Sequence, residues 1–313
     1  MKACIDIGGT KVAVSLAPPT TDAARPPELQ ARRAEPTAKT GDNGALARQI
    51  LRLLDEACAE AGVAPAEVTG AGVSSCGPFV LNAGCVELAT PNICGGLAGP
   101  ARGLPNDWTH VPLEAPLRQR FAHLRVENDG VAALEAERRW GALQGLDHCA
   151  YVTWSTGVGV GLCVDGRVLR GKNGNAGHAG HTFVSDTDLN ALCGCGNVGD
   201  VEGLVAGNAV ARRFEGDAAA MLTAAGAGDA AALAQVDALC RVMGRMLYNL
   251  TVTLDLQRIS LGGSVFWHHR ALLLPRLQAQ LDGRLTALTA GVELVPAGLG
   301  DRVGDYAALA LVG

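Results

Sequence analysis

The 313-residue chain lacks the features that mark several broad classes of protein. It has 26 lysines and arginines against 31 aspartates and glutamates, and a net charge of −5 argues against the basic surface that nucleic-acid binding requires. No charge-free apolar run is long enough to span a membrane. Asp6 interrupts the first apolar run, so no secretory signal is expected. We therefore expect neither nucleic-acid nor membrane partners.

Regular cysteine spacing is also missing. Ten cysteines are scattered along the chain, and no signal peptide accompanies them. This usage predicts reduced thiols in a cytoplasmic protein rather than a disulfide framework. Only Cys193 and Cys195 have a spacing that suggests a shared task.

The residues that are present form alternating strand and helix patterns. The segment 2–16 predicts two strands joined by a double glycine. Apolar residues at helical spacing predict a helix over 46–61, and Asp129 at a strand end predicts the start of another. A long helical region is expected over about 203–254, whereas 90–108 is so rich in glycine and proline that it predicts a surface loop. The alternation predicts an α/β fold.

Both halves of the chain open with a strand, a glycine turn and a second strand. These units are Asp6–Ser15 and Thr153–Val164. The weak internal symmetry predicts two similar lobes that face each other across a cleft.

Glycine turns of this kind can bind phosphate, because their backbone N–H groups are not covered by side chains. A plain hairpin explains either turn alone. Two turns together, one preceded by Asp6 and one with the hydroxyls of Ser155 and Thr156, favour a nucleotide whose β- and γ-phosphates lie between them. Asp6 could then hold Mg²⁺ through water.

Asp129 has two interpretations that local sequence does not separate. Capping of the following helix alone explains an aspartate at this position. Alternatively, its carboxylate accepts a proton from a substrate hydroxyl while Asn128 binds a neighbouring hydroxyl. Phosphoryl transfer requires little more than positioning, charge neutralisation and one carboxylate that orients the nucleophile.

A second cluster of polar residues has the composition of a zinc site. Cys193 and Cys195 supply two thiolates from one turn, His181 lies upstream, and Asp200 follows as an oxygen ligand. The alternative is a hydrogen-bonded histidine beside two small buried cysteines. Glu202 lies at the start of a helix, where a favourable interaction with the helix dipole also explains it.

Taken together, these motifs resemble the ROK family of repressors, open reading frames and sugar kinases. The resemblance covers nearly the whole chain and rests on "DIGGTK", "GVSSCGP", "VENDGVAA", "STGVGVGLCVDGRVLRGKNGNAGHAGH", "CGCGNVGDVEG" and "ISLGGS", in the family's order. It implies an actin-like fold, two ribonuclease-H-like domains around a central cleft. It also implies an ATP- and Mg²⁺-dependent kinase that phosphorylates a hexose, usually at the 6-hydroxyl.

The resemblance assigns roles to individual residues. Asp129 matches the catalytic base. The residues expected to bind the sugar are Asn128, His178, His181, Glu202, Gly77 and Asn106. Mg-ATP is expected at Asp6, Gly8, Gly9, Thr10, Lys11, Thr156, Gly157, Gly159, Gly262 and Gly263. The expected structural zinc ligands are His181, Cys193, Cys195 and Asp200, and the zinc would fix the loop that places the histidines against the sugar.

Two positions depart from the family pattern. Asp200 stands where the family usually has a fourth cysteine ligand, and His178 stands where it usually has glutamate. An imidazole can donate as well as accept hydrogen bonds. Histidine at this point is also similar to relatives that resemble N-acetylmannosamine kinases, so amino- and acylamino-hexoses, kanosamine among them, join glucose as candidate substrates. The long loop over 93–108 is expected to reshape the sugar pocket.

The resemblance also sets expectations for the whole molecule. A small domain is expected over 1–117, completed by a helix at 301–313, and a large domain over 118–300. A homodimer is expected. ROK repressors have an amino-terminal DNA-binding domain, and none is expected here because the first functional-looking residues begin at Asp6. The rival from another class is a sugar sensor without catalysis, against which Asp6, Asp129 and both glycine turns argue.

Overall fold

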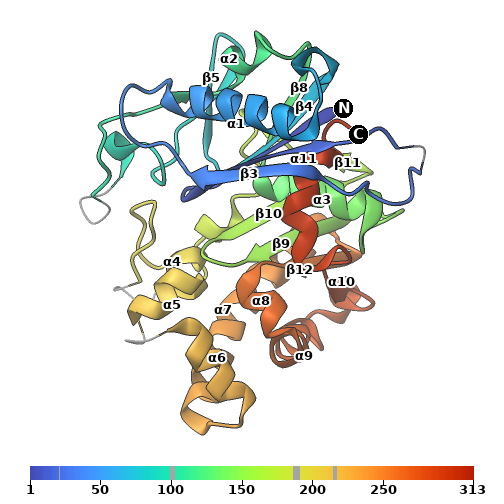
Figure 1. The fold of residues 1–313 in the computed structure, drawn as a ribbon. Helices are drawn as coiled ribbons and strands as arrows, with labels where there is room; N and C mark the ends of the chain where they lie inside the picture. The colour runs from blue at the N-terminus through green and yellow to red at the C-terminus, as the bar shows by residue number, and fades with distance from the viewer. Residues whose placement is uncertain (21, 99–102, 186–190, 214–216) are drawn as a thin grey trace. The chain divides into compact units, whose positions relative to one another are not determined.

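The structure, a computed structural model, describes residues 1–313 except 21, 99–102, 186–190 and 214–216. Contacts divide the chain into two compact units. Unit 1 contains Met1–Trp140, Arg170–Ala176 and Arg302–Gly313, and unit 2 contains Gly141–Leu169 and Gly177–Asp301. Each unit contains one five-stranded sheet (Figure 1).

The sheet of unit 1 has an antiparallel half and a parallel half. Its order is β3 (Gln30–Pro36), β2 (Lys11–Ala17), β1 (Lys2–Ile7), β4 (Gly70–Ser75) and β8 (His123–Asn128). The first three strands pair antiparallel, and β1, β4 and β8 are parallel. The parallel register aligns Ile7 with Ser75 and Ser75 with Asn128, so three strands end at the same edge of the sheet.

Helices cover both faces of this sheet. Alternation along β1 puts Ile5 into one core with Leu46 and Ile50 of α1 (Ala45–Ala61), the helix predicted over 46–61. The opposite face packs against α11 (Val303–Ala310), which contacts α3 (Asp129–Trp140) as well as β1 and β4 (Figure 1). Helix α3 begins at Asp129, as predicted.

Unit 2 repeats this strand order and pairing pattern. Its sheet runs β11 (Arg167–Val168), β10 (Val158–Val164), β9 (Cys149–Trp154), β12 (Arg258–Gly262) and β13 (Glu293–Pro296). Here too the first three strands are antiparallel and the last three parallel. The β1–β2 and β9–β10 hairpins hold the two predicted glycine turns. The predicted symmetry and the duplicated ribonuclease-H-like fold are therefore confirmed.

Seven helices of the described chain belong to unit 2. They are α4 (Val201–Val205), α5 (Gly207–Arg213), α6 (Ala218–Gly226), α7 (Ala230–Leu254), α8 (Ser264–His268), α9 (Arg270–Leu281) and α10 (Thr286–Thr289). The helical region expected over 203–254 is thus divided into four. Asp217 and Asp229 cap the amino ends of α6 and α7, which explains two of the interruptions.

The segment after β4 differs most from expectation. It forms a small sheet of β5 (Phe79–Asn82), β6 (Cys85–Leu88) and β7 (Val111–Pro112), followed by α2 (Glu114–Arg118). A cis peptide bond joins Gly77 to Pro78 just before β5. The expected surface loop over 90–108 is wrong in part, because Ile93 and Cys94 are fully buried in the core of unit 1. Residues 99–102 of that loop lie outside the described residues.

The division by contacts extends unit 1 to Trp140 and adds Arg170–Ala176 to it. The domain limits expected from sequence, 1–117 with 301–313 and 118–300, stay a prediction. No helix in the described ranges combines the length and the apolar character of a membrane span.

Candidate functional site

Two carboxylates meet where the parallel strands of unit 1 end. Asp6 is the last residue but one of β1, and Asp129 follows β8 directly and opens α3. Strand β4 lies between them and leads into Cys76. The register described above therefore gathers Asp6 and Asp129 at one edge of the sheet. Ligand sites of α/β proteins characteristically lie at this edge of parallel strands.

The electrostatics of Asp6 reflect this gathering. Burial and the nearby negative charge of Asp129 raise its pKa from 3.8 to about 6, and Asp305 acts in the same direction. The positive charges of Lys11 and Arg32 oppose the rise. Two carboxylates in mutual repulsion are the kind of group that a cation would stabilise.

The N-cap of α3 is Asn128, because the helix begins at Asp129. Asn128 Oδ1 accepts the Gly130 N–H at 3.0 Å as a cap does, and Asp129 Oδ1 accepts the same N–H at 2.8 Å. Asn128 is 5% exposed. The interpretation of Asp129 as the helix cap is therefore wrong, and its local role is limited to the bond with the Gly130 N–H. It leaves the second role open, because an ionised carboxylate offers about four lone-pair sites.

The first glycine turn, Gly8–Lys11, is tight and held from several sides. Gly8 N–H donates to the Lys11 carbonyl at 2.8 Å, and the Thr37 hydroxyl donates to the Gly8 carbonyl at 2.7 Å. Gly9 lies against Asn92, since a Cβ added to Gly9 would be 2.7 Å from the Asn92 Cβ. Sequence reasoning missed Asn92. It lies in a loop without a motif, and only the tertiary contact reveals it.

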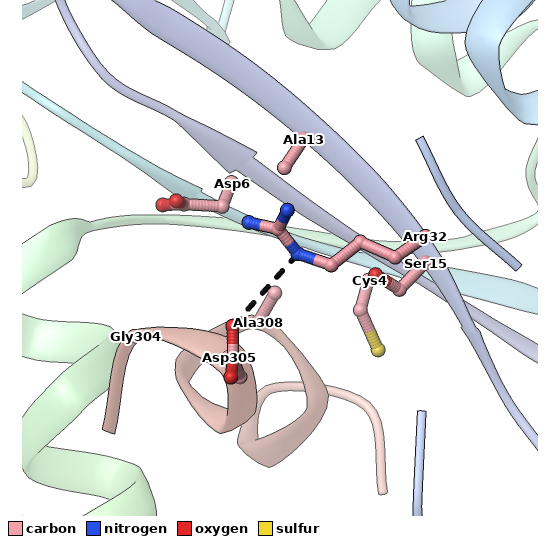
Figure 2. Close-up of a pocket in the computed structure, with 8 residues that line it drawn as sticks. All are labelled: Cys4, Asp6, Ala13, Ser15, Arg32, Gly304, Asp305 and Ala308. Carbon is pink, nitrogen blue, oxygen red and sulfur yellow. Dashed lines mark ion pairs between the residues drawn. The ribbon is translucent and has the colours of Figure 1, made fainter. Parts of the chain in front are cut away.

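A small cavity lies behind Asp6, between the sheet and α11 (Figure 2). Its volume is about 10 Å³, and it is lined by Cys4, Asp6, Ala13, Ser15, Arg32, Gly304, Asp305 and Ala308. Figure 2 shows the Arg32 side chain crossing the sheet toward Asp305, with 4.0 Å between Nε and Oδ1. The space is suited to about one water molecule and not to a sugar.

Asn106, expected to bind the sugar, organises its own loop. Its Oδ1 accepts from the N–H groups of Gly95 at 2.7 Å and Trp108 at 3.1 Å. Its Nδ2 donates to the carbonyls of Lys39 at 2.9 Å and Ile93 at 3.1 Å. Backbone groups therefore take both acceptor and both donor positions of this amide. A contact with substrate would have to displace one of them.

The second glycine turn is joined to Glu202. Glu202 Oε2 accepts the Val158 N–H at 3.0 Å, and a Cβ added to Gly157 would be 2.8 Å from the same oxygen. The other oxygen, Oε1, accepts from the Cys193 thiol at 3.5 Å. One carboxylate thus connects the turn to the histidine–cysteine cluster. The sequence analysis assigned Glu202 to the sugar and Gly157 to Mg-ATP. Nothing in the local sequence indicates that Glu202 of α4 reaches Val158 of β10.

The predicted zinc ligands come together. One ligand atom from each of His181, Cys193, Cys195 and Asp200 lies within 4.8 Å of the others. The His181 Nδ1 is 3.1 Å from the Asp200 Oδ2 and 3.7 Å from the Cys193 Sγ, and the Cys195 Sγ is 3.5 Å from that Oδ2. A tetrahedral ion with N, O and S ligands at its usual bond lengths would separate them by about 3.3 to 3.8 Å. The four residues therefore fit zinc.

Asp200 is fully buried and has a double task. Its Oδ1 accepts the Gly203 N–H at 2.7 Å and caps α4, while Oδ2 faces the cluster. Hydrogen bonding to Asp200 raises the pKa of His181 against the effect of burial. Burial raises the pKa of the thiols of Cys193 and Cys195, so both are protonated while no metal is bound.

His178 and the double glycine complete the set in unit 2. The rings of His178 and His181 lie with centroids 6.0 Å apart, and His178 directly precedes the short turn Ala179–His181. Gly262 and Gly263 are required by packing against β9. A Cβ would be 2.4 Å from the Tyr151 hydroxyl at Gly262 and 2.4 Å from a backbone carbonyl of β9 at Gly263. Packing therefore explains this glycine pair without a nucleotide.

The candidate residues fall into two groups. Unit 1 holds Asp6, Gly8, Gly9, Thr10, Lys11, Gly77, Asn106, Asn128 and Asp129, and unit 2 holds Thr156, Gly157, Gly159, His178, His181, Cys193, Cys195, Asp200, Glu202, Gly262 and Gly263. Within each unit the geometry joins residues far apart in sequence, Asp6 with Asp129 in one and Glu202 with the second turn in the other.

Solved structures with this architecture include two kinases. A ROK hexokinase from Thermus thermophilus has a TM-score of 0.73 at 29% identity, with 99% of this chain and 97% of that chain covered. A ROK family glucokinase from Streptomyces griseus, in complex with glucose and AMPPNP, has a TM-score of 0.65 at 26% identity and covers 97% and 96% of the two chains.

Sequence comparison gives a consistent result. A glucokinase from Aeropyrum pernix is 29% identical over 275 residues, 80% of this chain and 81% of the relative. An N-acetylmannosamine kinase from Shigella boydii is 32% identical over 268 residues, covering 83% and 82%. The model of the ROK family matches residues 2–313. The chain therefore belongs to the ROK family.

Proposed function

We propose that this protein is a sugar kinase that transfers the γ-phosphoryl group of ATP to a hexose or amino-hexose. One observation carries the proposal most directly. Asp6 and Asp129 lie beside a glycine turn at the end of parallel strands, and the negative charge of Asp129 adds to the effect of burial in raising the pKa of Asp6. The similarity to glucokinases and N-acetylmannosamine kinases supports the same conclusion.

Asp129 would act as the base. Its carboxylate accepts the proton of the 6-hydroxyl as that oxygen attacks the γ-phosphorus, and Asn128 bonds to a neighbouring hydroxyl. Bound Mg²⁺ would neutralise charge on the phosphates. Asp6 would orient its water ligands, and the turn Gly8–Lys11 would direct backbone N–H groups toward phosphate oxygens.

The residues of unit 2 would bind the sugar and the other side of the nucleotide. Thr156, Gly157 and Gly159 form the second phosphate turn, with Gly262 and Gly263 nearer the adenosine. His178, His181 and Glu202 contact sugar hydroxyls, and Gly77 supplies backbone contacts. Asn106 acts by holding its loop. A zinc ion at His181, Cys193, Cys195 and Asp200 would fix the segment that contains the two histidines, a structural role.

The substrate is proposed as a class with two leading members. Glucose is the first, by similarity to glucokinases. N-acetylmannosamine is the second, and the imidazole of His178 favours it, because this ring can donate to an acylamino carbonyl where a carboxylate cannot.

A coupled assay of ADP release tests the proposal. It is run with glucose, mannose, fructose, glucosamine, kanosamine and N-acetylmannosamine, and the product is assigned by phosphorus NMR. We expect sugar-dependent ADP release and phosphate on the 6-oxygen. ADP release that stays at the ATPase background with all six sugars would contradict the proposal. Sugar binding without turnover would favour the sensor, the second candidate, in which the glycine turns have no phosphate to bind.

A further inference from the structure

A short segment of unit 1 is flanked in sequence by two stretches of unit 2. Arg170–Ala176, here called the crossing loop, follows Leu169 and precedes Gly177, both of which belong to unit 2. The Ala176 N–H donates to the Arg170 carbonyl at 2.9 Å and closes the loop on itself. The crossing loop therefore makes most of its contacts within unit 1, whereas the residues on either side of it in sequence make theirs within unit 2.

Two ion pairs attach the start of the crossing loop to unit 1. Arg170 Nε is 2.6 Å from the Glu127 Oε1, and Arg170 Nη2 is 3.1 Å from the Glu135 Oε1. Arg125 contacts the same two oxygens at 3.1 and 3.3 Å. Glu127 is 7% exposed, so little water competes for these pairs.

Asn175 attaches the other end. Its Oδ1 accepts the Phe79 N–H at 2.7 Å, and its Nδ2 donates to the Phe79 carbonyl at 2.8 Å. We call these two bonds the Asn175 clamp. Two bonds to one residue fix the amide in position and orientation. The Phe79 ring is 2% exposed, and Gly174 packs against it, because a Cβ there would be 3.3 Å from the ring.

Each residue of the clamp is close in sequence to a residue that we propose to bind the sugar. Phe79 follows Gly77 by two residues, and His178 follows Asn175 by three. Three residues of extended chain reach at most about 11 Å, so the clamp limits where His178 can lie. Gly177, between the clamp and His178, packs closely against the backbone of β10. Its φ is +90°, and an added Cβ would be 2.2 Å from the Val160 carbonyl oxygen.

We propose that Asn175 is a positioning residue for the sugar, fixing the end of the crossing loop from which the chain continues to His178. The inference rests on the proposed function, because it concerns the same sugar site. Asn175 does not touch the reacting atoms. Its loss should therefore loosen sugar binding more than it affects ATP binding or the chemical step.

Steady-state kinetics of Asn175→Ala test the inference, with the sugar found active in the panel. We expect the KM for sugar to rise about tenfold, while kcat and the KM for ATP stay within about twofold. Asn175→Asp should be at least as impaired, because it puts a carboxylate oxygen against the Phe79 carbonyl. Asn173→Ala, two residues earlier in the crossing loop, is the matched control and should keep the wild-type KM.

A merely structural role predicts a different pattern. If Asn175→Ala lowers kcat and raises both KM values together, or leaves the sugar KM unchanged, the inference is wrong. Should that variant fail to fold, Asn175→Ser retains one hydrogen-bonding group and should show an intermediate sugar KM. Hydrogen exchange at the Phe79 amide checks the clamp without turnover, and unchanged exchange in the variants contradicts it. A wild-type protein inactive on every sugar overturns the proposed function instead.

Discussion

At the scale of single residues, Asp129 combines a local hydrogen bond at the start of α3 with the proximity of a second carboxylate, Asp6. The Gly130 N–H donates to its Oδ1 and also to the Asn128 Oδ1, which is the N-cap bond of α3. The proximity of Asp6 is not required for capping, and it raises the electrostatic cost of both charges. A cost of this kind at a strand end is typical of functional sites rather than of helix ends.

Asp129→Asn should separate the two roles. The amide oxygen still accepts the Gly130 N–H, so the fold should be preserved. The base is lost, and kcat should fall by about 10² to 10⁴. Calorimetry should find the affinity for sugar within a few-fold of wild type. Turnover near the wild-type rate would contradict the assignment of the base.

Asp6→Asn should stabilise the fold while abolishing activity. In wild type the pKa of Asp6 is about 6, against 3.8 in the unfolded chain. The folded state therefore binds more protons between these values, and the free energy of unfolding falls as pH rises through this window. Because asparagine does not ionise, the free energy of unfolding of the variant does not fall in this way.

We expect Asp6→Asn to unfold in urea with a free energy about 1 to 3 kcal/mol higher than wild type at pH 8, and nearly equal to it at pH 4. Asp55→Asn, on the exposed face of α1, is the control and should show no such pH-dependent gain. Equal stability of Asp6→Asn and wild type at pH 8 would mean that the buried charge costs nothing.

At the scale of elements, the histidine–cysteine segment depends on Asp200 twice, once for the cap of α4 and once for the candidate zinc. Asp200→Asn keeps a cap acceptor but loses the charge. We expect purified wild type to contain about one zinc per chain and the variant to contain much less, with a raised KM for sugar. Cys193→Ser and Cys195→Ser should behave alike.

Asp217→Asn is the matched control for that experiment. It makes the same change at the cap of α6, where the side chain accepts the Ala219 N–H at 2.9 Å. Its zinc content and sugar KM should equal those of wild type. Wild-type protein free of zinc after purification without chelator would contradict the metal assignment.

The packing of α11 on the sheet depends on Gly72. A Cβ there would be 1.9 Å from the Ala308 carbonyl oxygen, which belongs to helix backbone and cannot rotate away. Gly72→Ala should lower the free energy of unfolding by about 3 kcal/mol or more. Gly304→Ala, within α11 and with open space at its Cβ, should be neutral or slightly stabilising. Chemical denaturation of both variants tests this, and a mild effect at Gly72 would contradict the close packing.

The sequence predicted elements well where the signal is local. Helix 46–61, the start of α3 at Asp129 and both glycine hairpins follow from periodicity, capping and turn residues. The small sheet of β5, β6 and β7 could not be predicted, because its strands are short and β7 pairs across a long irregular segment. For the same reason the burial of Ile93 was not visible.

At the scale of the whole molecule, the sequence predicted that Asp129, the glycine turns and the four candidate zinc ligands serve one site. It did not predict the contacts that connect them. It could not predict that Glu202 bonds to Val158, that Asn106 is saturated by backbone, or that Asn92 contacts Gly9. Each of these is a contact between residues distant in sequence, which tertiary packing alone decides.

Ligand-linked stability provides a test on the whole molecule. A kinase should be stabilised by its sugar and, separately, by a non-hydrolysable ATP analogue with Mg²⁺. At a hundred times the dissociation constant each should add about 2.7 kcal/mol to the free energy of unfolding, seen as a rise in Tm. A sugar sensor would respond to sugar alone. No response to the ATP analogue would therefore favour the sensor.

The position of α11 has a consequence for biosynthesis. This helix packs on β1 and β4, which precede unit 2 in the chain, yet its own residues leave the ribosome after all of unit 2. The part of the unit 1 sheet that α11 covers must therefore remain exposed until translation has passed residue 302, while the whole of unit 2 is already available to fold. Nascent chains stalled before this point should leave the face of β4 that contains Gly72 accessible to solvent, and those stalled with residue 313 outside the ribosome should not.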